Sequence, residues 1–288
     1  MTLRYSCIQR RFKSGLALVA VTLSAGLFSM AAGAEVTAPA AGKSPVIDKI
    51  RAGGELRAGI AIAPPWLGQD PSDGSYFGPA HEIGKRVSEA LGVELTIVPS
   101  GWDTIIAGLQ ADQFELALAP LFATDKRKKV VDFVTYTEAG TCYAVLDSND
   151  KVNTLEDMND PSVTIGTWSG TGTEHGIRER YTKARINSVV QAVGGSHRLD
   201  DLFAKRIDAA PFDAPNAFVI VEEHANVKIL PGGPAHCVNN SDIPFPVGMA
   251  FNYGDAELKN FLEAVVIDMK SDIDAAIVRY SAARYMKQ

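Results

Sequence analysis

The sequence predicts an α/β protein built as two wound lobes. Apolar strand-like segments alternate with amphipathic helical segments between Gly54 and Ala119, and the same alternation starts again near Val163. Alternation of this kind indicates a parallel sheet with helices on its faces. Several strands end in loops that contain glycine, proline or aromatic residues, and open α/β sheets bind ligands at these strand ends. Those loops are therefore where a site is expected.

Residues 1–34 are expected to be a secretion signal that is removed. Four Lys and Arg residues lead into the apolar segment Leu16–Met30, and Ala32-Gly33-Ala34 supplies the small residues that a signal peptidase requires. The apolar segment is short for a membrane span. We therefore expect secretion into the periplasm. Removing 34 of the 288 residues leaves 254, enough for two domains of ordinary size.

Charge and cysteine content narrow the class of function. The signal removes four of the 28 Lys and Arg residues, which leaves 24 against 34 Asp and Glu, a net charge of −10. This balance argues against nucleic acid or anionic lipid as a partner. The five histidines show no metal-ligand spacing, so neither a metal nor a cofactor is expected. In an oxidising compartment, Cys142 and Cys237 are expected to form a disulfide.

The first lobe is predicted to contain three strands and two helices. In the helix of residues 78–92, Ile83, Val87 and Leu91 recur every four residues, and Gly92 provides a C-terminal cap. The other helix is expected at 102–110, and the strands at 55–63, 94–98 and 115–119.

The second lobe repeats the pattern, and the chain then closes with one strand and two helices. Strands are expected at 163–167, 188–193, 209–212 and 227–230, and helices at 173–181, 196–205 and 215–223. The proline- and glycine-rich segment Pro231–Pro246 is expected to be a loop. After it come a strand at 247–251 and helices at 256–270 and 273–286.

One strand end carries an unexplained cation. The apolar segment Leu116–Ala119 leads to Thr124-Asp125, a helix start at which the threonine side chain caps free N–H groups. Arg127 then lies in the first helical turn, at the positive end of the helix dipole, where a cation is disfavoured. A bound anion held by the guanidinium and the free N–H groups explains this placement. A solvated basic turn is the alternative.

Two other strand ends carry polar candidates. The turn Gly166–Gly176 lacks the dinucleotide and phosphate-loop spacings, but it places Thr171 at a helix N-terminus, which suits a carboxylate. A plain connecting turn is an equal interpretation. Asp213 follows a strand and precedes Pro215, so taken singly it is a helix cap. The functional alternative is a cleft carboxylate that pairs with an ammonium group.

Four aromatic residues fall in these loops: Trp66, Trp102, Phe122 and Trp168. Aromatic residues at strand ends usually fill the core. If several converge on one mouth, they form a stacking pocket for an apolar or cationic group.

Taken together, these segments resemble the periplasmic solute-binding proteins of polar amino acid ABC importers, family 3. The collinear pieces include ELRAGI, PPW, TDKRKKVVDF, SGTGTE, RIDAAPFDAPN and VGMAFNYGDAELKNFLEAV, and they cover nearly the whole mature chain. The resemblance implies a type II periplasmic binding protein fold, in which two crossover strands join two lobes around a ligand cleft. Lobe 1 is then 45–138 and 247–288, lobe 2 is 141–243, and the hinge lies at 138–141 and 243–247.

The resemblance also implies roles for individual residues. Arg127 would clamp the ligand α-carboxylate, which Thr171-Gly172 would bind from the opposite lobe. Asp213 would take the α-ammonium, and Trp66 and Trp102 would sandwich the ligand side chain. With these roles, the bound-anion interpretation of Arg127 becomes the favoured one.

This chain departs from the family pattern along the expected pocket wall. Pro120 and Phe122 stand where the family commonly has glycine and then serine or threonine. The Pro120 carbonyl still accepts from an ammonium group, whereas Phe122 puts a ring in place of a hydroxyl. The usual acidic residue of the first strand–helix loop is also missing. We expect a smaller and more apolar pocket.

Two classes of function follow from the resemblance. The favoured one is a monomeric receptor that captures an amino acid or related amino-carboxylate and delivers it to the membrane permease of an ABC importer. The alternative is a periplasmic enzyme on the same fold, similar to cyclohexadienyl dehydratase, which needs a cleft acid or base. Glu174 is the one candidate besides Asp213, and it is better explained as a first-turn helix acid. A soluble sensor domain is a third interpretation.

Overall fold

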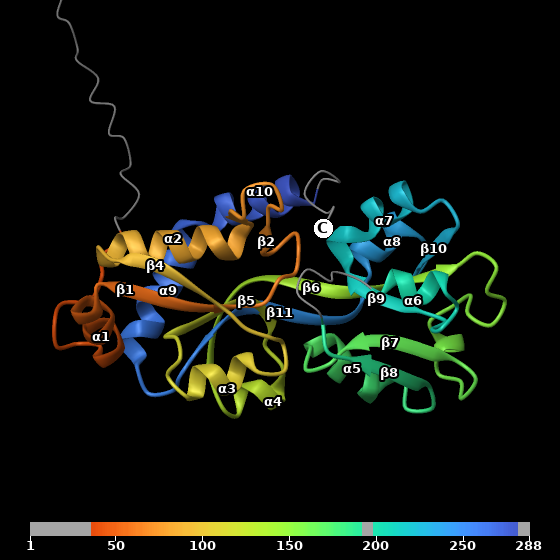
Figure 1. Cartoon of the computed structure of the whole chain (residues 1–288), viewed down its shortest axis with the longest axis horizontal. Helices are drawn as coiled ribbons and strands as arrows, with labels where there is room; N and C mark the ends of the chain where they lie inside the picture. The colour runs from red at the N-terminus through yellow and green to blue at the C-terminus, as the bar shows by residue number, and fades with distance from the viewer. Residues whose placement is uncertain (1–35, 192–197, 282–288) are drawn as a thin grey trace, which may run out of the picture. The chain divides into compact units, whose positions relative to one another are not determined.

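Two long strands carry the fold (Figure 1). The computed structural model of the chain describes residues 36–191 and 198–281. Within them, β6 (Asp132–Leu146) and β11 (Asp242–Phe251) pair antiparallel inside a seven-stranded sheet. The start of β6 pairs with the end of β11 in one lobe, and the end of β6 pairs with other strands in the second lobe. The chain therefore passes between the lobes twice.

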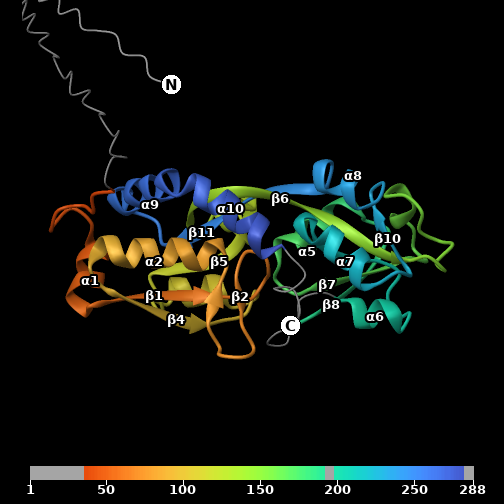
Figure 2. The same cartoon turned by 90° about the horizontal axis from the view of Figure 1, so that it is seen from above.

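In the first lobe, β1 (Glu55–Ile60) lies between β4 (Glu94–Pro99) and β5 (Leu116–Phe122) and is parallel to both. Strand β11 adds antiparallel to β5. Helices α2, α9 and α10 pack together over one face of this sheet, and α3 lies on the other (Figures 1 and 2). The remaining elements of this lobe are α1 (Pro45–Gly53), β2 (Gly68–Gln69), β3 (Tyr76–Phe77), α2 (Pro79–Leu91), α3 (Ile105–Gln110), α4 (Asp125–Lys128), α9 (Ala256–Asp268) and α10 (Lys270–Tyr280).

In the second lobe, β9 (Ala210–Asp213) and β10 (Val227–Leu230) both pair antiparallel with β6. A separate parallel pair is formed by β7 (Thr164–Trp168) and β8 (Arg185–Val189). The helices of this lobe are η1 (Glu156–Met158), α5 (Gly172–Arg180), α6 (Leu199–Phe203), η2 (Ala214–Asn216), α7 (Ala217–Glu223) and α8 (Pro234–Asn239).

Strand β5 shows how the first lobe builds a core on both faces of its sheet. All seven of its residues are buried. Leu116 and Leu118 enter the apolar cluster beneath α2 and α9, whereas Ala117 and Ala119 enter the cluster beneath α3. Because successive side chains point to opposite faces, a strand covered on both sides is apolar throughout rather than alternating. The end of β5 is thereby held rigidly where it meets the cleft.

The predicted α/β fold is confirmed, and several elements match closely. Strand β10 has the predicted bounds. Helix α2 buries Ile83, Val87 and Leu91 and ends at Gly92, whose φ of 69° is the left-handed conformation that a glycine cap supplies. The expected secretion signal at 1–34 lies outside the described residues. Among the residues that are described, no helix is long and apolar enough to cross a membrane.

The prediction of a loop over Pro231–Pro246 is wrong. Pro234 is the first residue of α8, a position at which the missing N–H of proline costs no hydrogen bond. Strand β11 then begins at Asp242 and runs through Pro244 and Pro246, with a register shift between Asp242 and Phe245. Prolines are tolerated in strands at such irregularities. Composition alone therefore hid both a helix and half of a crossover strand.

The strand predicted at 188–193 is shifted in the structure. Strand β8 begins at Arg185 and ends at Val189, and Val190, which the prediction placed in the strand, is 65% exposed. Residues 192 and 193 lie outside the described residues. Helix α6 is also shorter than predicted, because it covers only Leu199–Phe203.

The two passages between the lobes lie beside each other. Pro246 pairs with Glu138, and Asp242 pairs with Thr141, so the two predicted hinge segments are neighbours in the β6–β11 ladder. Proline donates no ladder hydrogen bond, which reduces the pairing at this waist. The lobe boundaries 45–138, 141–243 and 247–288 stay predictions.

The predicted disulfide is present. Cys142 in β6 and Cys237 in α8 are bonded, with Cα atoms 6.0 Å apart, and both residues are fully buried. The bond ties the second-lobe half of the crossover strand to a short helix that follows β10.

We predict that removing this disulfide destabilises the protein substantially. The cysteines are 95 residues apart, and a loop of that size corresponds to about 4–5 kcal/mol in the chain-entropy account, as an upper figure. The double variant Cys142→Ala/Cys237→Ala should unfold at clearly lower denaturant concentration than the wild type. Two free thiols in the unfolded, unreduced wild type would contradict the prediction.

Candidate functional site

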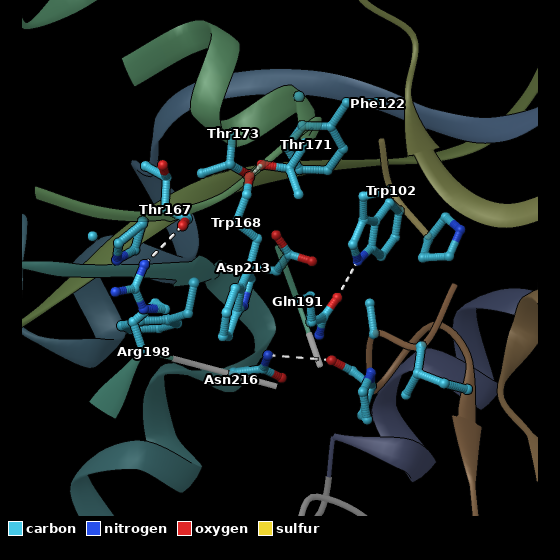
Figure 3. Close-up of a pocket in the computed structure, with 18 of the residues that line it drawn as sticks. Trp102, Phe122, Thr167, Trp168, Thr171, Thr173, Gln191, Arg198, Asp213 and Asn216 are labelled. Carbon is cyan, nitrogen blue, oxygen red and sulfur yellow. Dashed lines mark hydrogen bonds between the residues drawn. The ribbon is translucent and has the colours of Figure 1, made fainter. Parts of the chain in front are cut away.

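A cavity opens where the strand ends of both lobes meet (Figure 3). Its volume is about 720 Å³, which includes the open mouth. One wall comes from the loop after β1, the end of β5 and Arg127 in α4. The opposite wall comes from the ends of β7 and β9 and the start of α5. These are loops that the sequence marked as strand ends.

Arg127 is the buried member of an otherwise exposed basic run. Lys126, Lys128 and Lys129 are exposed, whereas Arg127 is 8% exposed and lines the cavity. The Thr124 side chain accepts from the Arg127 backbone N–H at 3.3 Å, as the capping pattern predicted. The solvated-turn alternative is wrong, because the residue is not at the surface.

The guanidinium of Arg127 retains donors without an acceptor in the part of the chain that the structure describes. Its two terminal nitrogens donate to the carbonyls of Phe122 at 3.1 Å and Gly170 at 2.9 Å. A guanidinium has five N–H donors, so three have no hydrogen-bond acceptor among the described residues. No described carboxylate lies within ion-pair distance of it. Burial lowers the pKa of Arg127 to about 10, which keeps the group charged at neutral pH.

Asp213 is the acidic counterpart on the opposite wall. It ends β9, and its carboxylate accepts the indole N–H of Trp66 at 2.8 Å. It makes no side-chain cap at η2, so the helix-cap interpretation is wrong. The residue is half-exposed and lines the cavity. Burial raises its pKa to about 6, although the Trp66 hydrogen bond opposes the rise. Its negative charge adds to the burial that raises the pKa of Tyr136.

At Thr171 and Gly172, the free groups belong to the backbone rather than to the hydroxyl. The Thr171 hydroxyl accepts from the Glu174 N–H at 3.1 Å and donates to the Trp168 carbonyl at 2.8 Å. Helix α5 begins at Gly172, and the first N–H groups of a helix have no partner within it. The N–H groups of Gly172 and Thr173 are thus available to an anion at this end of the cavity.

Three of the four predicted aromatic residues line the cavity. Trp102 and Trp168 lie on either side of Asp213 in the view of Figure 3. Phe122 is 5% exposed, lines the cavity and packs against Phe245 with ring centroids 5.4 Å apart. Pro120, two residues earlier in the same strand, also lines it.

Trp66 lies one layer behind the cavity. It is 1% exposed and is not among the lining residues, and its indole N–H holds the Asp213 carboxylate. The stacking role that the resemblance implied is therefore replaced here by a positioning role. The indole N–H of a buried tryptophan usually finds an acceptor, and this tendency is the feature of the sequence that could have suggested a positioning role for Trp66.

Arg198 is a cavity residue that the sequence did not suggest. It is 4% exposed, and all five of its N–H donors are used, by the carbonyls of Thr167 and Asn187, the Asn187 side chain and the Asp201 carboxylate. Its guanidinium also lies 5.1 Å from the ring centroid of Trp168. Arg198 thus fixes the wall instead of offering a charge to a ligand.

The lining residues Gln191, Asn216 and Thr167 were also missed. Gln191 accepts the indole N–H of Trp102, and the Asn216 amide donates to the Pro64 carbonyl at 3.3 Å. Both bonds join the two lobes, as do Trp66–Asp213 and Arg127–Gly170. Thr167 and Asn216 fall inside strand-end loops in which a site was expected. Their residue types, however, do not distinguish them from ordinary loop residues.

The sequence matches a known family over most of its length. Residues 56–281 match the bacterial extracellular solute-binding proteins, family 3. The L-cystine-binding protein TcyJ of Escherichia coli (strain K12) is 25% identical over 229 residues, which cover 79% of this chain and 82% of TcyJ. The cyclohexadienyl dehydratase of Pseudomonas aeruginosa is 27% identical over 142 residues, which cover 49% of this chain and 53% of the enzyme.

Solved structures that resemble this chain are also amino acid-binding proteins. AncCDT-1, described as an ancestral amino acid-binding protein and a precursor of cyclohexadienyl dehydratase, has a TM-score of 0.69 at 29% identity, over 82% of this chain and 99% of its own. A second structure of AncCDT-1, described as an ancestral cationic amino acid solute binding protein, has a TM-score of 0.59 at 28% identity over the same shares. With the family match, the two-lobed fold and the cleft between its lobes, this chain belongs to family 3 of the bacterial extracellular solute-binding proteins.

Proposed function

We propose that this protein is a periplasmic receptor that captures an amino acid and delivers it to the permease of an ABC importer. The observation that carries the proposal is an arginine and a carboxylate, Arg127 and Asp213, which line opposite walls of one cavity and have no charged partner among the described residues. An amino acid head presents a carboxylate and an ammonium a few bonds apart. It therefore supplies the missing partner of each group at once.

The energetics favour such a ligand over one with a single charge. A buried charge without a partner is costly, and the two walls hold one of each sign. A carboxylate would meet the free donors of Arg127 and the N–H groups of Gly172 and Thr173. The ammonium would meet Asp213, and a ligand with only one of the two groups would leave the other charge unpaired.

Closure of the lobes is the second part of the proposal. Gly172 lies so close to β5 that a Cβ atom on it would be 2.5 Å from the Cβ atom of Phe122. Gly170 is equally close to Asp103 in the other lobe. Because these contacts join the two walls of the cavity, opening the lobes separates them and exposes the site. A monomer that closes in this way can present both lobes to a permease.

The enzyme alternative has one observation in its favour and one against it. The pKa of Asp213, about 6, is suited to proton transfer near neutral pH. Glu174, however, does not line the cavity: it accepts from the Gly170 N–H at 2.9 Å and pairs with Arg178 at 2.8 Å. Although partial burial opposes it, hydrogen bonds from Ser188, Arg178 and Gly170 keep the pKa of Glu174 below its usual range. Mass spectrometry should recover a bound ligand chemically unchanged, whereas turnover would favour the enzyme.

We predict that Arg127→Ala and Asp213→Asn each weaken amino acid binding by roughly 30-fold or more. Truncating one side of a desolvated charge pair costs about 2–5 kcal/mol, and 1.4 kcal/mol is about tenfold. Arg127→Lys should recover only part of the loss, because an ammonium does not reproduce the planar fork. The measurement is calorimetry with the ligand identified by mass spectrometry of the denatured protein.

Matched controls lie in the same turn. Lys126→Ala removes an exposed positive charge next to Arg127, and Asp125→Asn removes an exposed negative one. Both should bind the ligand as the wild type does. Binding within about threefold of wild type in Arg127→Ala or Asp213→Asn would show that the zwitterion proposal is wrong.

We predict that affinity falls at acidic pH. Asp213 has a raised pKa of about 6 in the free protein, so below pH 6 it is protonated and must release its proton to bind an ammonium. The dissociation constant should be constant above about pH 7 and should rise by up to about tenfold for each pH unit below 6. Asp213→Asn should bind weakly at every pH without this slope. A wild-type profile that is flat down to pH 4.5 would contradict the prediction.

We predict that Gly172→Ala acts as a wedge. The added methyl meets the Phe122 Cβ atom, which belongs to a rigid buried strand, so the lobes should close incompletely. Ligand affinity should fall at least about tenfold, and small-angle scattering at saturating ligand should give a larger radius of gyration than for wild type. Gly53→Ala is the control, because a Cβ atom there meets nothing within 4 Å. Wild-type affinity in Gly172→Ala would contradict the closure proposal.

A further inference from the structure

One residue in the waist between the lobes has a strained backbone. Among the described residues, those other than glycine with a positive φ are Asp112, Lys205 and Ile243. Asp112 and Lys205 are exposed and lie just beyond the ends of α3 and α6, where a left-handed residue commonly ends a helix. Ile243, with a φ of 48°, lies inside β11, and a β-branched residue rarely adopts this conformation.

The sequence at this point favours a different conformation. Ile243 precedes Pro244, and the residue before a proline is biased towards extended backbone. β-branched residues also favour extended backbone. A residue in a sparsely populated conformation persists only where the surrounding structure holds it there. The groups on each side of Ile243 must therefore impose its left-handed conformation.

On the N-terminal side, Asp242 is fixed to the second lobe. It is buried, and its carboxylate accepts hydrogen bonds from the hydroxyl groups of Tyr143 at 2.9 Å and Tyr181 at 2.5 Å. It also pairs with Arg180 at 2.8 Å. Tyr143 belongs to the second-lobe half of β6, and Arg180 and Tyr181 lie at the end of α5. Three side chains of the second lobe thus hold the start of β11.

The Ile243 side chain also packs against the second lobe. A Cβ atom on Gly176, inside α5, would be 2.3 Å from the Ile243 Cγ2 atom, so the helix and the side chain are in close contact. The same helix begins at Gly172, which lines the cavity. One helix therefore contacts both the cavity and the strained residue.

On the C-terminal side, β11 belongs to the first lobe. Val247 pairs with Phe122 at the end of β5. The Phe245 ring packs against the Phe122 ring, with centroids 5.4 Å apart. The strand is thus fixed to one lobe before Ile243 and to the other lobe after it.

The residues between these two fixed parts are free of the strand ladder. Asp242 and Phe245 are three residues apart, but their partners in β6 are only two apart, so Ile243 and Pro244 lie in a bulge. Residues in such a bulge can rotate without breaking ladder pairs. Because the proline ring fixes φ of Pro244, most of the rotation must fall on Ile243.

From these observations we propose that Ile243 is the pivot of this crossover strand and that its strain favours opening of the lobes. The lobes touch in this structure, for example at Gly172 and Phe122, so the strain belongs to the form in which they are in contact. When they separate, the parts of β11 fixed to each lobe move relative to one another, and Ile243 returns to the extended region. It thereby opposes closure and promotes release of a bound ligand. This inference rests on the proposed function, since it assumes that the lobes close.

A series of substitutions at Ile243 separates backbone strain from side-chain packing. Glycine tolerates the left-handed region best, asparagine next and alanine less, whereas valine is β-branched like isoleucine. Asparagine is the informative member, because it is larger than alanine and yet better suited to a positive φ. Ile243→Gly and Ile243→Asn should therefore both close more readily than Ile243→Ala, and Ile243→Val should behave as the wild type does.

The first measurement is the distance between two spin labels, on cysteines introduced at Glu89 in α2 and at Asn226 after α7, both exposed positions. The labelled protein is unfolded without reductant and refolded, which removes co-purified molecules. Without added ligand, the ratio of short to long distances should be at least about fivefold higher in Ile243→Gly than in Ile243→Ala. Fivefold corresponds to about 1 kcal/mol, the lower end of the usual cost of a left-handed residue.

The second measurement is binding of an equimolar mixture of the twenty common amino acids and cystine. The concentration that half-saturates the change in label distance should be at least about fivefold lower in Ile243→Gly than in Ile243→Ala. Lys205→Gly is the control, because it relieves a φ of 55° at an exposed position away from the waist. It should leave both the distance ratio and the half-saturating concentration at their wild-type values, and an equal shift in Lys205→Gly would overturn the assignment to Ile243.

The outcomes separate this inference from the proposed function. If the mixture neither binds to the wild type nor shortens its label distance, the proposed function fails and the pivot fails with it. If the wild type binds and closes but Ile243→Gly and Ile243→Ala behave alike, the proposed function stands and the pivot is wrong.

A comparison within the series covers the case in which Ile243→Gly does not fold. Ile243→Asn should then close more readily than both Ile243→Ala and Ile243→Val. If closure instead follows side-chain size, so that Ile243→Asn lies between Ile243→Val and Ile243→Ala, packing sets the balance and the inference is overturned.

Discussion

The structure depends on a constraint that is electrostatic: two opposite charges are held in the walls of one cavity and kept apart. Arg127 and Asp213 each lack a charged partner among the described residues, although Arg127 is buried and Asp213 is only half-exposed. Direct pairing of the two would satisfy both charges and remove the site. The fold places Arg127 in the short helix that follows β5 and Asp213 at the end of β9 in the other lobe. Under the proposed function, a ligand with two charges bridges them.

The rest of the architecture holds these groups in position. Asp213 is fixed by its backbone pairing with Thr141 in β6 and by the Trp66 indole, which reaches it from the other lobe. Arg127 is fixed by the Thr124 cap and by β5, whose residues are buried on both faces. Because β6 also forms a passage between the lobes, the strand that positions Asp213 is one of the two strands that join them. Under the proposed closure, a change at this passage would therefore also move the acid.

The sequence predicted features that depend on local physics and missed those that depend on tertiary contacts. Arg127 was found because a cation at a helix start contradicts the local field, and the Cys142–Cys237 bond followed from compartment and count. The helix and strand within Pro231–Pro246 were missed because packing and a register shift, not composition, make prolines acceptable there. Asn216 could not be singled out, because its side chain donates to the Pro64 carbonyl of the other lobe, a contact that exists only in the folded chain.

The polar atoms of the cavity divide into those that the protein uses and those that it leaves open. Arg198 has every donor engaged, and Gln191 has taken the Trp102 indole, so these side chains build the wall. Arg127 retains donors that meet no acceptor in the part of the chain that the structure describes. Since a folded protein pays for each buried polar atom left without a partner, selection for stability alone would favour their replacement. Under the proposed function, a residue of this second kind therefore indicates a group of the ligand more directly than the lining as a whole does.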